Sequence, residues 1–112
     1  MLTKPKRLNL KKDFKWVAAG KKIDSKYAKL FIRIGDNINP RIGIAVPSSQ
    51  FKKATQRNRA RRIVSAALEP LYAKLPKSIN IVALPKTAID NVKSGEVLLD
   101  LEAKLKDEKI IN

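Results

Sequence analysis

The chain has 112 residues, of which 44% are hydrophobic, and this composition predicts one compact domain with a core and not a disordered basic tail. It contains no cysteine and no histidine, which excludes disulfides and the usual zinc sites and removes the side chain that most often performs acid–base chemistry near neutral pH. The formal net charge is +15, and the whole excess lies in residues 1–68, which hold 18 Lys and Arg against three Asp.

A charge excess of this kind predicts a polyanionic partner, either nucleic acid or an anionic membrane. No apolar run approaches the roughly 18–20 residues of a membrane span, and the basic start of the chain leads into no hydrophobic signal region. A membrane surface would need a basic helix with a large apolar face, whereas the stripe beside the arginines of residues 57–62 is small and β-branched. We therefore expect a cytoplasmic protein with no membrane partner, folded as a single nucleic-acid-binding domain over residues 1–112.

The first predicted elements are a helix and two strands. Asn9 is a suitable N-cap for a short helix through Ala19, and Gly20 is a C-terminal stop. Residues 27–34 alternate in the manner of a half-buried strand. After turn residues at 35–40, a second strand is predicted at 41–46, where Pro47 ends it.

One face of the strand predicted at 27–34 mixes aromatic and basic side chains, and two more aromatics, Phe14 and Trp16, lie on the first helix. The strand residues are Tyr27, Lys29, Phe31 and Arg33. Aromatics beside bases can stack on unpaired nucleotides, with each stack worth roughly 1–3 kcal/mol. The alternative is that Phe14 and Phe31 are core residues beneath a helix, and the pattern leaves both readings open. Trp16, on the opposite side of its helix from Phe14, could pack or be exposed.

The second half of the chain predicts a helix, a strand and a helix. The first of these helices begins near Lys52 or Lys53 and runs to about Tyr72, unless Pro70 ends it early. Residues 79–84 predict a buried strand, and a packing helix begins after Ser94. This order predicts an α+β fold, a two-layer α-β sandwich with the sheet on one side and the helices on the other.

The predicted helix after residue 52 carries five polar groups within six positions and no carboxylate: Arg57, Asn58, Arg59, Arg61 and Arg62. At 3.6 residues per turn an apolar stripe runs beside them, formed by Ala60, Ile63, Val64, Ala67 and Leu71. Like charges at i and i+4, such as Arg57 and Arg61, repel by roughly 0.2–0.5 kcal/mol, and a polyanion would remove that cost. Lys52 and Lys53 extend the patch to the helix start, where free backbone N–H groups favour anions. The alternative is an ordinary solvated face.

No motif for chemistry is present. The four glycines form no phosphate loop, the acids form no metal cluster, and Ser48-Ser49 has no base or oxyanion architecture around it. Any chemistry must therefore come from a partner.

The arginine cluster resembles the signature of the bacterial ribonuclease P protein subunit. The matching stretch runs from residue 51 to Ser65, and its matching positions are Phe51, Ala54, Arg57, Asn58, Arg59, Ala60, Arg61, Arg62 and Val64. Arg7-Leu8 and Asp13-Phe14 resemble the family's first helix, residues 40–46 its Arg-Ile-Gly strand, and residues 79–85 its later hydrophobic strand. The sequence departs from the family pattern at Ala18, where a second Phe is common, at Ser48-Ser49, where a Lys pair is usual, and at Ser65, where an Arg is common.

The resemblance implies a mixed central sheet and a left-handed βαβ crossover that carries the arginine-rich helix. It implies a subunit of a ribonucleoprotein endonuclease that removes the 5′ leader of precursor tRNA, with the catalytic groups and most of the Mg²⁺ held by the RNA subunit. The implied partners are ribonuclease P RNA, with one protein per RNA, and precursor tRNA, with no small-molecule substrate. The residues implied to bind the RNA subunit are Lys52, Lys53, Arg57, Asn58, Arg59, Arg61 and Arg62, with an indirect Mg²⁺ contact near Asn58. The residues implied in the leader-binding cleft are Phe14, Tyr27, Lys29, Phe31 and Arg33.

Two other functions remain open from the sequence. A ribosomal-type structural RNA-binding protein with no processing role would show the same charge pattern. A basic module that docks an acidic protein would also tolerate an arginine helix without acids.

Overall fold

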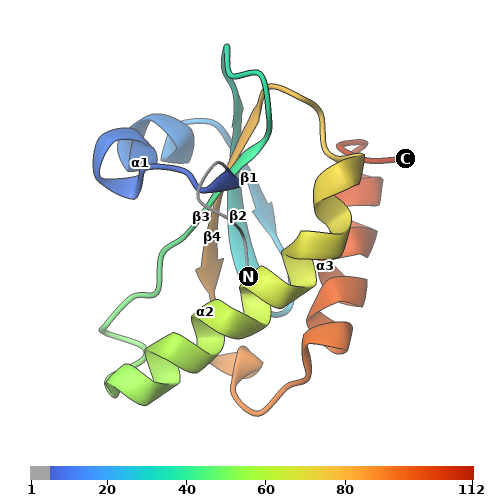
Figure 1. Ribbon diagram of the computed structural model, residues 1–112. Helices are drawn as coiled ribbons and strands as arrows, with labels where there is room; N and C mark the ends of the chain where they lie inside the picture. Colours follow the sequence, from blue (N-terminus) through green and yellow to red (C-terminus); the bar gives the residue numbers. More distant parts are fainter. Residues whose placement is uncertain (1–5) are drawn as a thin grey trace.

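The structure, a computed structural model, describes residues 6–112 and contains three α-helices, two 3-10 helices and four strands (Figure 1). In chain order the elements are α1 (Leu10–Ala18), β1 (Lys21–Asp24), β2 (Ala28–Ile34), β3 (Arg41–Ile44), α2 (Ala54–Leu68), η2 (Glu69–Lys74), β4 (Ile79–Pro85), η3 (Thr87–Ile89) and α3 (Ser94–Asp107).

The strands form one mixed sheet in the order β1-β2-β4-β3. β2 pairs antiparallel with both β1 and β4, whereas β3 and β4 are parallel neighbours joined through α2. Parallel neighbours need a crossover connection, and α2 supplies it. This confirms the predicted α+β class and the mixed central sheet.

The main core lies between the sheet and the helices α2 and α3. Alternate residues of β2 and β4, such as Leu30, Ile32 and Ile81, meet Val64 of α2 and Leu101 of α3, and all of these side chains are buried. The stripe predicted along α2 therefore packs as expected. α2 lies across the sheet as the crossover, and α3 packs beside it (Figure 1).

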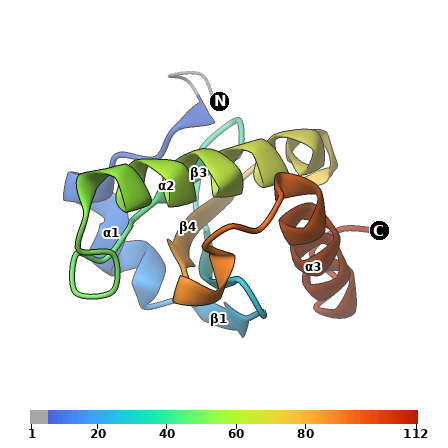
Figure 2. The same ribbon diagram turned by 90° about the horizontal axis from the view of Figure 1, so that it is seen from below.

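A second, smaller core lies on the opposite face of the sheet, beneath α1. Val17 of α1 packs there with Leu8 and Val82, and Phe14 and Phe31 pack around them half-buried. α1 and α3 accordingly stand on opposite sides of the sheet (Figure 2). The expectation that all helices share one side is wrong for α1, because Phe31 of β2 and Val82 of β4 give the second face of the sheet an apolar centre that α1 covers.

β1 differs from the sequence expectation, whereas the end of α2 agrees with it. β1 lies in a segment for which the sequence predicted no strand, because an edge strand rich in Lys shows little apolar alternation. α2 ends at Leu68, and the chain continues as the 3-10 helix η2 with Pro70 in its first turn. Proline cannot donate the hydrogen bond that an α-helix interior requires, so the early end predicted at Pro70 is confirmed.

Within residues 6–112, no helix combines the length and the apolar character needed to cross a membrane.

Candidate nucleic-acid interface

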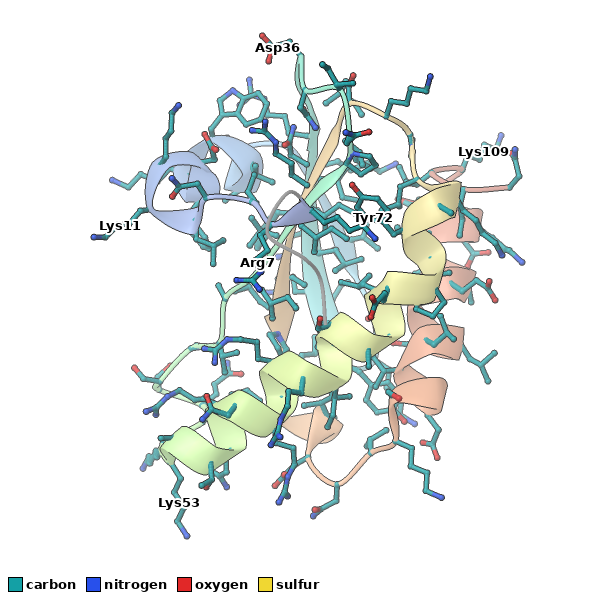
Figure 3. The ribbon with its side chains drawn as sticks, viewed as in Figure 1. Arg7, Lys11, Asp36, Lys53, Tyr72 and Lys109 are labelled. Carbon is teal, nitrogen blue, oxygen red and sulfur yellow. The ribbon has the colours of Figure 1, made fainter. Side chains whose placement is uncertain are left out.

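The solvent-facing side of α2 is a basic surface, which we call the α2 basic face and define as Lys52, Lys53, Arg57, Asn58, Arg59, Arg61 and Arg62. Arg57 and Arg61 are half-buried and the other five side chains are exposed. Lys53 is the N-cap residue, and its backbone N–H donates to Gln56 Oε1 at 3.3 Å. In Figure 3, Lys53 projects from the free end of α2, away from the sheet.

Arg57 is partly committed to holding the segment that precedes α2. Its Nη1 donates to the carbonyl oxygens of Phe51 at 2.8 Å and of Lys52 at 3.0 Å. Phe51 itself is buried in the main core. Arg57 therefore stabilises the start of α2 as well as adding to its charge.

The remaining polar side chains of α2 point in different directions. Arg61 Nη1 donates to Asn58 Oδ1 at 3.1 Å on the helix itself. Arg59 turns instead toward the segment between η3 and α3, where its Nη1 lies 3.3 Å from Asn91 Oδ1 and 3.9 Å from Asp90 Oδ1. The sequence did not reveal this carboxylate, because Asp90 lies far along the chain from α2. Arg59 is thus the member of the face that has an acidic neighbour.

The other ion pairs of the described residues lie away from the centre of this face. Lys21 pairs with Glu108 and Lys74 with Glu102, each at 3.2 Å, and Lys86 pairs with Asp24. Within residues 6–112, the three arginines Arg57, Arg61 and Arg62 form no salt bridge with a carboxylate. Cations without counter-charges in their own protein favour an anionic partner.

The second candidate surface lies on the α1 side of the sheet. We call it the aromatic groove and define it as Phe14, Lys29, Phe31 and Arg33. Lys29, Phe31 and Arg33 share this face of β2, opposite Leu84, Val82 and Asn80 of β4. Phe14 of α1 joins Phe31 in the same half-buried cluster. The structure therefore brings together four of the five residues predicted for the leader cleft. Near one end, Lys29 lines a hollow of about 510 Å³ with Gln50 and Lys86.

Tyr27 does not lie in the aromatic groove. It precedes β2 and is only 8% exposed within the main core. Its backbone N–H donates to Asp100 Oδ2 at 3.2 Å, and its hydroxyl donates to Glu96 Oε2 at 3.4 Å, both on α3. The prediction that Tyr27 shares a face with Lys29 and Phe31 is wrong, because the chain bends at Lys26 and Tyr27, in a turn where the Ser25 hydroxyl bonds to Ala28.

Trp16 lies at the other end of the aromatic groove from Lys29. The guanidinium carbon of Arg33 lies 4.7 Å from the centroid of the Trp16 ring, and Arg33 Nη1 donates to the Trp16 carbonyl at 3.0 Å. Arg33 is thus engaged with α1. Trp16 stays 39% exposed, which settles the alternative left open by the sequence in favour of a partly exposed ring.

The α2 basic face and the α1 side of the sheet meet around the β3 edge. Leu8 N donates to Ile42 O at 2.9 Å, so the segment before α1 adds to this edge. Arg7 and Arg61 line one hollow of about 230 Å³ there, over Leu8, Ile42 and Gly43. Figure 3 shows Arg7 between α1 and α2.

Two bases at this junction were not among the predicted site residues. Arg7 forms a bridge with Ile42, and Arg41 is exposed at the start of β3. The alternation of β3 could have revealed Arg41, because Ile42 points into the main core and its neighbour must point the other way.

The residues near Asn58 do not fit a directly bound magnesium ion. Among residues 6–112, no group of three or more His, Cys, Asp or Glu could hold a metal. The Asn58 amide oxygen already accepts a hydrogen bond from Arg61, and guanidinium groups surround it in sequence. Magnesium prefers carboxylate and phosphate oxygens, so this chain offers it no suitable ligand set at Asn58.

The fold and these surfaces define a class of protein: a small α+β sandwich whose crossover helix presents a basic face beside an aromatic groove. A family model described as Ribonuclease P matches residues 2–109. The chain belongs to the ribonuclease P protein family, as the resemblance of residues 51–65 to the family's signature led us to expect.

Individual relatives show the extent of the similarity. The chain is 39% identical over 72 residues to the ribonuclease P protein component of Pseudoalteromonas atlantica, a match that covers 64% of this chain and 59% of that protein. It is 31% identical over 91 residues to the corresponding protein of Nitrosococcus oceani, covering 80% of this chain and 76% of that one. The solved structure of the ribonuclease P protein of Thermotoga maritima superposes with a TM-score of 0.78 at 29% identity, covering 90% of this chain and 96% of that one.

Proposed function

We propose that the chain is the protein subunit of a ribonuclease P, which binds the catalytic RNA of that enzyme and the 5′ leader of precursor tRNA. Leader removal then gives the mature 5′ end of the tRNA, and the hydrolytic groups and magnesium belong to the RNA partner. The single observation that carries the proposal is the α2 basic face, in which Arg57, Arg61 and Arg62 form no salt bridge with a carboxylate within residues 6–112, and the whole face lies inside the segment that the family model matches.

The two surfaces receive different parts of the RNA on this proposal. Arg61 and Arg62 offer planar forks that match phosphate oxygens, so the α2 basic face binds the catalytic RNA. Phe14 and Phe31 keep part of each ring exposed beside Lys29, so the aromatic groove binds the single-stranded leader. Tyr27 is left out of this groove because it is buried under α3.

The arrangement around the β3 edge supports simultaneous contact with both RNAs. Arg7 and Arg61 line the same hollow, so positive charge continues from α2 towards α1. A catalytic RNA seated on α2 would therefore present its active site close to a leader lying in the groove. Substrate positioning of this kind lowers the barrier without any catalytic group on the protein.

Reconstitution tests the proposal. The cognate catalytic RNA is incubated with precursor tRNA across a magnesium series, with and without the protein, and the 5′ cleavage product is measured. We expect the protein to restore cleavage at low magnesium. An absence of stimulation at every magnesium concentration would overturn the proposal.

The alternative of a structural RNA-binding protein is separated by affinity. The reconstituted complex should bind precursor tRNA more tightly than mature tRNA, because the leader adds contacts in the aromatic groove. Equal affinities would favour the structural role. A partner that stays bound in a pull-down after RNase treatment would favour a module that docks an acidic protein.

A further inference from the structure

Exposed apolar side chains gather around one hollow at the end of the sheet. Trp16 is 39% exposed, Ile34 58% and Ile38 82%, and only Leu99 on α3 joins them as an exposed large hydrophobic side chain among the described residues. Trp16 and Ile38 line a hollow of about 530 Å³ between α1 and the β2–β3 segment. Ile34 does not line it, because Ile34 shares the main-core face of β2 with Leu30 and Ile32. A scattered apolar residue needs no explanation, whereas a group beside one hollow marks a binding surface.

The Trp16 ring is held in position before any partner binds. Arg33 lies over the ring with its guanidinium carbon 4.7 Å from the centroid and bonds to the Trp16 carbonyl. Gly35 allows the ring to approach the β2–β3 segment, because a Cβ there would lie 3.0 Å from Trp16 Cη2. An aromatic surface fixed in this way loses little conformational entropy when a second ring stacks on it.

The segment that forms the other wall of the hollow is also fixed. Asn80 of β4 is only 4% exposed, and its Nδ2 donates to Asn37 Oδ1 at 2.9 Å. Asn37 Nδ2 in turn donates to Ile79 O at 3.2 Å, and Ser78 Oγ donates to Asn37 O at 3.0 Å. These bonds satisfy a buried amide and hold the segment against β4, so the hollow is preformed.

The charges around the hollow favour a nucleotide with its base inside. Lys12 and Arg41 are exposed bases that line the hollow and can meet phosphate oxygens. Asp13 and Asp36 line it too, and their carboxylates would repel a phosphate but can accept hydrogen bonds from the amino group of a base. Asp36 stands at the tip of the β2–β3 segment (Figure 3).

We propose that this hollow binds one unpaired nucleotide of a single-stranded RNA, with its base against Trp16 and its phosphates at Lys12 and Arg41. The hollow continues the aromatic groove, because Arg33 lies two residues along β2 from Phe31, a rise of about 6.6 Å. The inference rests on the proposed function only for the source of the strand, which is then the leader of precursor tRNA.

Fluorescence reads this site directly, because Trp16 is the only tryptophan in the chain. The protein is titrated with a short single-stranded RNA, with the same strand carrying abasic positions, and with inorganic polyphosphate. We expect the intact strand to quench the fluorescence and the other two to bind with little quenching. Equal quenching by polyphosphate would overturn the proposal.

Two pairs of variants complete the test. Trp16→Leu should weaken binding of single-stranded RNA by about 5-fold to 150-fold, the equivalent of one stack of about 1–3 kcal/mol, whereas Trp16→Phe should retain most of it. Ile38→Glu should weaken binding more than Leu99→Glu, which makes the same change at an exposed position of α3. Folded variants that bind like the wild type would refute the site.

The two proposals can fail separately. Quenching by single-stranded RNA without any stimulation of cleavage would leave the nucleotide site standing and remove the ribonuclease P role. Stimulated cleavage with wild-type leader affinity in Trp16→Leu would do the reverse.

Discussion

Replacing Arg57 by alanine should destabilise the free protein, whereas the same change at Arg62 should not. Arg57 Nη1 donates to two carbonyl oxygens before α2, at 2.8 and 3.0 Å, while the Arg62 side chain is exposed and makes no comparable bond to the described part of the chain. Both changes remove one positive charge from the same helix, so the pair isolates the hydrogen bonds.

The size of the effect follows from these contacts. The bond to Phe51 O is half-buried and the bond to Lys52 O is exposed, and at about 1 kcal/mol each they give about 2 kcal/mol for Arg57. Relief of the repulsion with Arg61 returns about 0.2–0.5 kcal/mol. The net loss is about 1.5 kcal/mol, and an unfolding entropy of about 2.1 cal/mol/K per residue makes this about 6 °C in melting temperature.

Thermal unfolding followed by circular dichroism at moderate salt measures the difference. We expect Arg57→Ala to melt about 6 °C below the wild type and Arg62→Ala to remain within about 2 °C of it. Equal melting temperatures for the two variants would refute the reasoning, since Arg57 would then hold nothing before α2.

Three further predictions concern RNA affinity, anion binding and pH. Arg62→Ala should reduce the magnitude of the log–log slope of RNA affinity against salt by about 0.7–0.9, because one phosphate contact is lost. Lys106→Ala, a change at an exposed position of α3, should leave the slope unaltered. Equal slopes for Arg62→Ala and the wild type would mean that Arg62 meets no phosphate. Sulfate should raise the melting temperature of the free protein more than chloride at matched ionic strength, because a bound anion stabilises only the folded state, and an identical response would indicate screening alone. Burial raises the pKa of Tyr72 above its ordinary value of 10.0, so the unfolded chain loses this proton first and stability should fall as the pH rises above about 10. In urea titrations, Tyr72→Phe should reduce the fall of the free energy of unfolding with pH. It should also cost about 1 kcal/mol at neutral pH, because the Tyr72 hydroxyl donates to Pro40 O at 2.7 Å. An unchanged pH dependence would assign the fall to other groups.

Local signals in the sequence were sufficient for the helices. The N-cap predicted at Asn9 is present, with Asn9 Oδ1 accepting from Lys12 N at 3.3 Å. The stripe at Ala60, Val64 and Ala67 is buried, and Pro70 ends the α-helical geometry. Each of these features depends on neighbours within one or two turns, which periodicity and capping rules capture.

Long-range packing was not accessible to the same rules. Tyr27 follows the alternation of β2 in sequence, yet the bend at Lys26 and Tyr27 and the bonds to α3 turn it into the main core. Asp90 reaches Arg59 only because the chain returns to α2 after η3. Alternation places a residue on a face only where the strand is continuous, and partners distant in sequence depend on tertiary structure.

The two candidate RNA-binding surfaces differ in the same way in how far the sequence predicts them. The α2 basic face was visible in the sequence because its residues follow one another in a short run at the start of one helix. The hollow at Trp16 was not, since it combines α1, the β2–β3 segment and the buried amide of Asn80. Only the exposed fraction of the ring and its contact with Arg33 make that surface evident.

The rate of precursor tRNA cleavage at low magnesium tests the central claim most directly, when the cognate catalytic RNA is combined with matched variants. The wild type should stimulate cleavage, Arg61→Ala/Arg62→Ala should lose most of that stimulation, and Lys104→Ala/Lys106→Ala, which removes the same charge from α3, should retain it. Equal stimulation by the two double variants would contradict a specific role for the α2 basic face, and no stimulation by the wild type at any magnesium concentration would contradict the account as a whole.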